Sequence, residues 1–298
     1  MRSIIGLMAA IFLMTAKPSP AQNAGQILKF GLIADVQYAN CEPSGSRFYR
    51  HSLEKLENCV KHLNNEGVEF TVNLGDAIDR DFLDLDSVLI RLNRLSAPVY
   101  NLTGNHDYSS LSDNELLYRK LNMEQAYYSF EHGEWLFLML NTNEIASYSN
   151  IGGTKQEEEL KAMMSRIKRT KSSNGATWNG GVGHKQLEWL DGLLSAAEQS
   201  GQKVMIFSHH PLYPPTSFSA LNNFELLDVI GKYRCVKAVF SGHHHAGDFA
   251  YFRGIPMVTA EGMVETSDKN SFATVEIHGN KIVVNGYGRM SSRKFDLH

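Results

Sequence analysis

Five short polar motifs recur along the chain, and each directly follows a run of apolar residues. They are Asp35-Val36-Gln37, Gly75-Asp76, Gly104-Asn105-His106-Asp107, Ser208-His209-His210-Pro211 and Gly242-His243-His244-His245. Taken singly such a motif is weak evidence, because Gly-Asp after a strand is commonly a turn and consecutive histidines can form a solvated loop. Ligands of open α/β sheets bind beyond the carboxyl ends of strands, so the five together predict one shared crevice.

The residue types in these motifs favour a pair of divalent metal ions. Asp, Gln and Asn supply oxygen ligands, His supplies nitrogen, and no thiolate is involved; this mixture suits Mn²⁺, Fe or Zn²⁺. Two metals about 3.5–4 Å apart share a bridging carboxylate and can clamp an in-line phosphoryl displacement. Two divalent ions give +4, Asp35 and Asp76 give −2 and a bridging hydroxide gives −1, so the site keeps +1 and can hold an anionic phosphate.

Apolar runs that end at these motifs predict the strands that position them. Strands are expected over residues 27–35, 70–76, 98–102, 203–208 and 236–241. Helical spacing of Leu and Val predicts helices over residues 53–63, 85–92 and 187–194. β-Hairpins are expected over residues 127–141 and 272–285. This pattern predicts one α/β domain with packed sheets flanked by helices. Residues 144–182 are polar and loop-like, and so long a connection predicts a functional insertion near the site.

In this order, the motifs resemble those of the calcineurin-like metallophosphoesterases, which use Asp-x-His, Gly-Asp, Gly-Asn-His-Asp/Glu, a lone His and Gly-His-x-His. The resemblance implies an α/β (α+β) fold, a four-layer αββα sandwich of two mixed β-sheets flanked by helices. It implies two ligand sets: Asp35, Gln37, Asp76 and His245 for one metal, and Asp76, Asn105, His209 and His243 for the other.

The resemblance also implies roles for the residues beside these ligands. His106 is expected to be the nearby acid or transition-state stabiliser, and Asp107 is expected to orient it. In the fourth motif His210 is the alternative to His209 as the ligand. His244 falls at the family's variable position and is not expected to bind metal.

Gln37 departs from the His that the first motif usually carries. A carboxamide oxygen is a harder ligand than imidazole and should favour Mn²⁺. This feature resembles a narrower group, the manganese-dependent ADP-ribose/CDP-alcohol diphosphatases. Other stretches that resemble this group are 31–37, 49–53, 178–181, 186–187, 189–190 and 261–266, and the similarity runs over roughly residues 29–289.

Membership of that group implies a reaction. The substrate is a nucleoside diphosphate joined to a second alcohol, such as ADP-ribose, CDP-choline or CDP-glycerol. Hydrolysis of its phosphoanhydride gives a nucleoside monophosphate and a phosphorylated alcohol. Two metals acidify the attacking water, and His106 can donate a proton to the leaving or non-bridging oxygen.

Two basic residues and one loop are candidates for outer substrate contacts. Arg47 or Arg50 can hold the second phosphate with its planar guanidinium, and the alternative is that both are solvated charges where a helix begins. Asn179, Gly180 and Gly181 can form a loop that faces the base or ribose, since glycine lets the backbone approach a ligand. The alternative for these three is a plain turn.

The N-terminus has the features of a secretory signal. Arg2 precedes an uncharged, mostly apolar run over residues 4–16, and small residues lead to a cleavage site after Ala21. The run is short of the about 20 residues of a membrane span, and an uncleaved anchor is the alternative. We therefore expect a signal over residues 1–21, a single metallophosphoesterase domain over 22–298, and export to the periplasm or medium without a membrane attachment after cleavage. The related enzymes look cytosolic in animals, so export leaves the physiological substrate open.

Composition limits the other functions. Of the 298 residues 43% are hydrophobic and 20% are charged, which is near the globular average, and the net charge of −3 argues against a nucleic-acid partner. The odd number of cysteines cannot form a complete disulfide framework; a Cys41–Cys59 bridge and buried free thiols are the two interpretations for these residues.

Two further functions compete with the diphosphatase. One is a secreted phosphomonoesterase or cyclic-nucleotide phosphodiesterase that uses the same metals. The other is a metal-free interaction scaffold on the same fold. A scaffold should have lost ligands, whereas every ligand position in this chain carries a competent residue.

Overall fold

The computed structural model of the chain describes residues 27–297. The predicted signal over residues 1–21 lies outside the described residues. Within the described part of the chain, none of the helices combines the length and the apolar character that crossing a bilayer requires.

Two six-stranded sheets form the centre of the molecule. The first has the order β12 (Arg293–Asp296), β11 (Lys281–Gly288), β10 (Ser271–His278), β1 (Leu28–Ile33), β2 (Phe70–Asn73) and β3 (Val99–Asn101). The second has the order β4 (Tyr128–His132), β5 (Trp135–Met139), β6 (Lys203–Ser208), β7 (Val236–Ser241), β9 (Ile255–Thr259) and β8 (Asp248–Phe252). Both sheets are mixed: β1, β2 and β3 are parallel, as are β5, β6, β7 and β9. Antiparallel strands adjoin the first group at β1 only, whereas β4 and β8 adjoin the second group at both ends.

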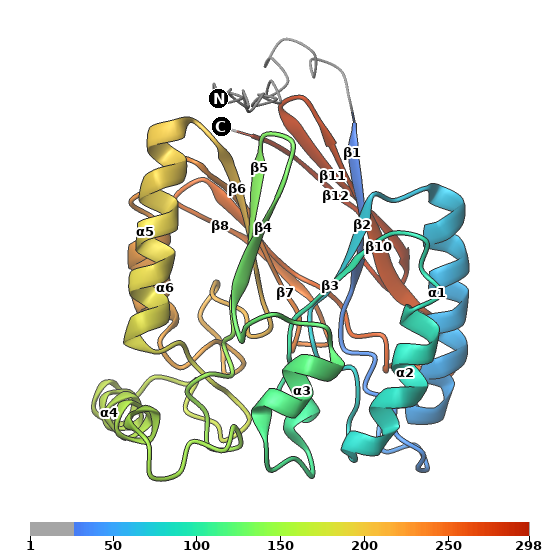
Figure 1. Cartoon of the computed structure of the whole chain (residues 1–298), viewed down its shortest axis with the longest axis horizontal. Helices are drawn as coiled ribbons and strands as arrows, with labels where there is room; N and C mark the ends of the chain where they lie inside the picture. Colours follow the sequence, from blue (N-terminus) through green and yellow to red (C-terminus); the bar gives the residue numbers. More distant parts are fainter. Residues whose placement is uncertain (1–26, 298) are drawn as a thin grey trace, which may run out of the picture.

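Helices cover the outer face of each sheet (Figure 1). Helices α1 (Ser52–Glu66) and α2 (Leu85–Leu92) pack on the first sheet, and α5 (His184–Ser200) and α6 (Asn223–Ile230) pack on the second. The predicted four-layer αββα sandwich is therefore confirmed. Gly67 and Gly201 end α1 and α5 in the left-handed conformation that glycine adopts without strain.

The inner faces of the sheets meet in an aromatic core. Phe30 stacks on Phe70 with ring centroids 4.9 Å apart, and its edge contacts Phe137, Phe207 and Phe240 from the second sheet. Each of these buried rings contributes about 1.5–3 kcal/mol by leaving water. The core holds the two sheets in fixed positions, and so it also fixes the loops at their ends.

The prediction that residues 144–182 are loop-like is wrong in its middle. Lys155–Thr170 forms helix α4, which packs on a small cluster of its own. Its contacting side chains are Leu160, Met163, Met164 and Ile167, at the spacing of one helical face. The other faces of α4 carry mainly charged residues, so the average composition of the segment did not indicate a helix. Helices α3 (Asn114–Lys120) and α6 and strands β8, β9 and β12 were likewise not predicted individually.

All three cysteines are free thiols in the described structure. Cys59 and Cys235 are buried and Cys41 is half-buried. The Cys41–Cys59 bridge is not formed, so the interpretation as free thiols holds.

Candidate metal centre

Strand ends from both sheets bring the predicted ligands to one seam. Asp35, Asp76 and Asn105 follow β1, β2 and β3 of the first sheet, and His209, His243 and His245 follow β6 and β7 of the second. The ligand atoms of Asp35, Asp76 and His245 all lie within 4.8 Å of one another. Carboxylates thus come from one sheet and imidazoles from the other.

The first ligand group contains an unsatisfied oxygen. Gln37 Nε2 donates to Asp76 Oδ2 at 2.9 Å, and this leaves Gln37 Oε1 buried without a hydrogen-bond partner. His245 Nε2 lies 3.6 Å from Asp35 Oδ1. An unpaired buried carbonyl oxygen is costly, whereas a divalent cation among these side chains would satisfy it. The donor set therefore fits a metal ion.

The second group is built around His209. Its Nδ1 donates to the Leu74 carbonyl at 2.9 Å, which leaves Nε2 free to act as a ligand. Nε2 lies 3.4 Å from Asp76 Oδ2 and 3.2 Å from Asn105 Oδ1. The imidazole of His243 packs beside it, with ring centroids 5.0 Å apart.

His210 lies in the same cluster, but both of its ring nitrogens are already engaged. Nδ1 is 2.9 Å from Thr142 Oγ1, and Nε2 is 3.2 Å from the Trp178 carbonyl. Burial and the neighbouring His209 lower the pKa of His210 to about 3, so it remains neutral. The geometry thus favours His209 over His210 as the ligand beside Asp76.

Backbone strain concentrates at the ligand positions. Asp35, Gln37, Asp76 and His243 adopt φ values of 52°, 43°, 55° and 67°. Non-glycine residues rarely occupy this left-handed region, and such residues cluster at functional sites. Gly104 leaves the space that Asp76 occupies, because a Cβ at position 104 would lie 2.1 Å from Asp76 Oδ1.

The buried carboxylates determine the electrostatics of the centre. Asp35 and Asp76 are fully buried, and no solvent balances their charge. Burial lowers the pKa of His209, but the adjacent Asp76 outweighs this effect and raises it to about 9. Burial also lowers the pKa of His245, and hydrogen bonds to Asp35 and Glu265 raise it to about 9. The seam is therefore a site that requires positive charge, which two divalent ions would supply.

The expectation that Asp107 orients His106 is wrong. The Asp107 carboxylate instead accepts hydrogen bonds from the backbone N–H groups of Asp76, Ala77 and Gly104 at 2.9, 2.8 and 2.8 Å. It stabilises the two turns that carry Asp76 and Asn105. Asp107 is therefore placed to shape the metal centre and does not contact the ring of His106.

Asp79 takes the position beside His106 that Asp107 was expected to take. His106 Nδ1 lies 3.2 Å from Asp79 Oδ1, and Asp79 also pairs with Arg47 at 3.4 Å and with Arg80 at 2.7 Å. Sequence reasoning missed Asp79 because the second motif was read as ending at Asp76. The available signal was a second acid three residues later, followed by an arginine.

The structure separates the two candidate arginines. Arg47 contacts Asp79 and forms an isolated β-bridge with Glu265, so it lies beside the metal centre. Arg50 is exposed and pairs with Asn40 at 2.9 Å and Glu42 at 2.5 Å. Arg47 is the better placed of the two for a substrate phosphate.

The predicted substrate loop reaches the centre through Asn179. Asn179 Oδ1 lies 3.0 Å from His243 Nε2, and its Nδ2 donates to the Asn174 and Ser217 carbonyls at 2.8 and 2.7 Å. Gly180 packs so closely that a Cβ would lie 2.4 Å from the Thr142 carbonyl oxygen. Gly181 pairs with Ile145 and backs onto Asn222, away from the ligands.

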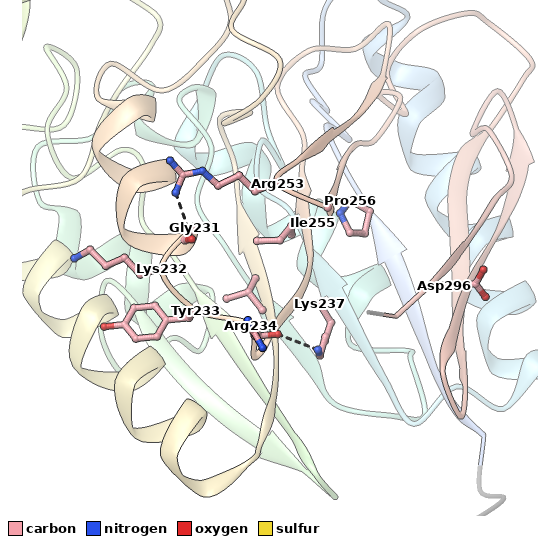
Figure 2. Close-up of a pocket in the computed structure, with 11 residues that line it drawn as sticks. Gly231, Lys232, Tyr233, Arg234, Lys237, Arg253, Ile255, Pro256 and Asp296 are labelled. Carbon is pink, nitrogen blue, oxygen red and sulfur yellow. Dashed lines mark hydrogen bonds between the residues drawn. The ribbon is translucent and has the colours of Figure 1, made fainter.

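A separate cavity of about 470 Å³ lies by the turn between β8 and β9 (Figure 2). Lys232, Tyr233, Arg234 and Arg253 are among its lining residues, and none of the predicted ligands lines it. Its arginine and lysine side chains make local contacts, such as Arg253 with the Gly231 carbonyl and Lys237 with the Arg234 carbonyl. This cavity therefore plays no part in the metal centre.

Comparison with known proteins agrees with this geometry. The family model described as calcineurin-like phosphoesterase matches residues 28–247. The chain belongs to the calcineurin-like phosphoesterase family. It is a metallophosphoesterase, a hydrolase of phosphate esters or anhydrides built for two metal ions.

Individual relatives cover nearly the whole chain. A protein of Arabidopsis thaliana is 32% identical over 91% of this chain and 97% of its own length. A protein of Homo sapiens is 29% identical over 94% and 96%. Both are named manganese-dependent ADP-ribose/CDP-alcohol diphosphatase.

Solved structures share the sandwich. A dimetal phosphatase from Danio rerio has a TM-score of 0.83 at 27% identity. The match covers 91% of this phosphoesterase and 99% of the Danio rerio chain. GAP50, described as the anchor in the inner membrane complex of Plasmodium, has a TM-score of 0.60 at 15% identity and covers 91% and 89%. That second likeness concerns the fold alone. Since one fold accommodates different functions, this second likeness does not carry over to what the phosphoesterase does.

Proposed function

We propose that this phosphoesterase hydrolyses the phosphoanhydride of nucleoside diphosphate-X substrates, such as ADP-ribose, CDP-choline or CDP-glycerol, with two Mn²⁺ ions. The observation that carries the proposal is the complete ligand set at the seam, with Gln37 in place of the usual histidine. Its Oε1 is buried and unpaired, as a ligand oxygen without its cation would be. The names of relatives that are similar over 91% and 94% of the chain supply the substrate class.

Three residues of the chain are suited to different roles around the metals and the substrate: Asp76, His106 and Arg47. Two bound divalent ions would acidify a water molecule and neutralise phosphate charge. Asp76 lies between both ligand groups and is suited to bridge them. His106 is half-buried, its Nδ1 is held by Asp79, and its Nε2 is available to donate a proton to the leaving oxygen. Arg47 can hold the second phosphate with its guanidinium fork.

A substrate panel tests this function directly. The protein would be assayed with Mn²⁺ on ADP-ribose, CDP-choline, cyclic AMP and p-nitrophenyl phosphate, with Asp76→Ala as the inactive control. We expect the two diphosphates to have the highest kcat/KM, with AMP or CMP as a product. Preferential turnover of p-nitrophenyl phosphate or cyclic AMP would instead establish the phosphomonoesterase or phosphodiesterase alternative.

Gln37 offers a second test within the same panel. The variant Gln37→His restores the usual ligand of the first motif and should raise phosphodiesterase activity relative to diphosphate turnover. It should also weaken the preference for Mn²⁺ over Zn²⁺, because imidazole is the softer ligand. If neither ratio changes, Gln37 does not determine selectivity.

We also propose export of the protein with cleavage after Ala21. The proposal is supported by Arg2, the apolar run over residues 4–16 and the small residues that follow. N-terminal sequencing of the full-length chain expressed in a bacterium, after separation of periplasm from cytoplasm, tests it. A cytoplasmic product that retains Met1 would contradict export.

A further inference from the structure

Lys55 is an unusual residue in helix α1, because it is a lysine that is only 4% exposed. Its ammonium donates to three backbone carbonyls of one turn: Met263, Glu265 at 3.1 Å and Thr266 at 3.0 Å. Burial lowers the pKa of Lys55 to about 8, so at pH 7 the side chain still carries the three N–H donors that these carbonyls use. Burying an ammonium that is hydrogen-bonded only to backbone carbonyls costs free energy of folding. The turn that supplies these carbonyls contacts the metal centre.

The turn over residues 263–266 contacts the first ligand group in two places. Its backbone N–H at Val264 donates to the Asp35 carbonyl at 3.0 Å. Its Glu265 carboxylate accepts from His245 Nδ1 at 2.8 Å. Asp35 and His245 are both expected ligands of the same metal, and this turn contacts both.

The turn also adopts a conformation that needs support. Thr266 has φ of 64°, which is a genuine outlier for a β-branched residue. The Thr266 carbonyl is one of the three that Lys55 binds, and its N–H donates to the Ser46 carbonyl at 3.0 Å. The Lys55 ammonium thus lies where it can maintain a strained turn.

We propose that Lys55 and Glu265 form one positioning device for the metal centre. The Lys55 ammonium binds the carbonyls of the 263–266 turn and so fixes the position of the Glu265 carboxylate. This carboxylate accepts from His245 Nδ1 and orients the imidazole so that its Nε2 faces Asp35. Neither residue touches substrate or reacting atoms; both act through His245. The inference rests on the proposed role of His245 as a metal ligand.

Mn²⁺ binding to the otherwise intact chain provides the test. The variants are Lys55→Met, Glu265→Gln and the double variant, with Lys61→Met as the matched control, since Lys61 is an exposed lysine of the same helix. Titration calorimetry should show about 10–100-fold weaker Mn²⁺ binding for each single variant, the usual cost of losing an outer partner of a ligating histidine. Because the two residues act in series, the double variant should lose no more Mn²⁺ affinity than the single variant that binds Mn²⁺ more weakly.

A spectroscopic readout separates positioning from general stability. In the metal-free protein, the hydrogen-bonded Nδ1 proton of His245 should give a downfield NMR resonance that Glu265→Gln moves upfield, because an amide oxygen is a weaker acceptor than a carboxylate. Lys55→Met should shift or broaden the same resonance, although Lys55 does not touch His245. Lys55→Gln, which keeps two N–H donors, serves if Lys55→Met does not fold, and it should give an intermediate loss of affinity.

Two outcomes would overturn the inference. In one, Lys55→Met or Lys55→Gln lowers the melting temperature but leaves Mn²⁺ affinity and the His245 resonance unchanged. In the other, the losses of Lys55→Met and Glu265→Gln multiply in the double variant. The variant His245→Ala distinguishes the hypothesis that His245 is a metal ligand from the hypothesis that Lys55 and Glu265 position it. Unchanged Mn²⁺ binding in His245→Ala would refute the proposed ligand set itself, whereas lost binding there with normal binding in the Lys55 variants refutes the positioning device alone.

Discussion

Asp76 is the residue on which both ligand groups depend. Its Oδ2 lies 3.4 Å from His209 Nε2, its Oδ1 accepts from the His106 backbone N–H at 2.8 Å, and it belongs to the same cluster as Asp35 and His245. Its pKa is held well below the usual range, since His209 and His106 outweigh the effect of burial. An ionised carboxylate between two groups of ligands is the arrangement that a bridging ligand requires.

The variant Asp76→Asn should lose bound metal and turnover together. An amide keeps the shape of the carboxylate but offers one ligand oxygen instead of two. We expect the metal content to fall below two ions per chain and kcat to fall by more than the about 100-fold that removal of an outer partner can cost. Elemental analysis and kinetics on the same sample measure both. Two retained ions with normal turnover would refute a bridging role.

Asp79 affects catalysis at a different point from Asp76. Asp79→Asn removes the charge beside His106 Nδ1 and leaves the metal ligands in place. We expect kcat to fall by about 10²-fold or more, in the range of general acid–base catalysis, with metal content unchanged. Asp86→Asn, in an exposed acid of α2, is the control. Equal kinetics of Asp79→Asn and the unaltered enzyme would mean that His106 is oriented by some other contact.

The imidazoles of His209 and His245 predict how metal binding depends on pH. The pKa of each is about 9 in the metal-free protein, so both are protonated at pH 7 and each must release a proton before Nε2 can bind a cation. Mn²⁺ affinity should therefore rise as the pH rises from 6 towards 9. Calorimetry in buffers of different ionisation enthalpy counts the released protons. An affinity that stays constant over this pH range would show that these nitrogens are not ligands.

At the scale of elements, the sequence located the centre because its ligands follow strands. Apolar runs before Asp35, Asp76 and His209 predicted β1, β2 and β6, and parallel strands end at one edge. Asp79 was missed although an acid followed by an arginine stands three residues after Asp76, and Glu265 was missed because its role depends on a tertiary contact with His245 that no local pattern records. Helix α4 was missed for a different reason: its apolar residues lie on one face only, and both the charged residues of the helix and the Gly- and Ser-containing segments around it make the insertion polar on average.

The turn after β3 can be tested through its glycine. In Gly104→Ala the new Cβ would lie 2.1 Å from Asp76 Oδ1 and 2.4 Å from the Asp76 backbone nitrogen, so the turn or the carboxylate must move. We expect a destabilisation of about 1–3 kcal/mol and weaker Mn²⁺ binding. Gly192→Ala is the matched control, because nothing lies within 4 Å of a Cβ at this helical position. That control should stabilise the protein by up to about 1 kcal/mol, and urea unfolding measures both variants. Unchanged Mn²⁺ affinity in Gly104→Ala would mean that the turn tolerates a side chain.

At the scale of the whole molecule, the predicted ligands come from both of the sheets that the aromatic core packs together. Asp35, Asp76 and Asn105 belong to loops of the first sheet, and His209, His243 and His245 belong to loops of the second. A metal bound by both sets closes the seam at the carboxyl ends of the strands. It binds the folded chain alone, since the ligands are distant in the sequence.

Mn²⁺ should therefore raise the thermal stability of the entire sandwich. At free Mn²⁺ of 100 times Kd the stabilisation is about 2.7 kcal/mol, which for a domain of this size raises the melting temperature by about 5 °C. A chelator should reverse the shift. Asp86→Asn should show the same shift as the unaltered protein, whereas Asp76→Asn should show little or none, because it lacks the carboxylate that connects the two ligand groups. If Mn²⁺ activated the metal-free protein without changing its melting temperature, ligation across the seam would be contradicted, because an ion that binds only the folded chain must stabilise it.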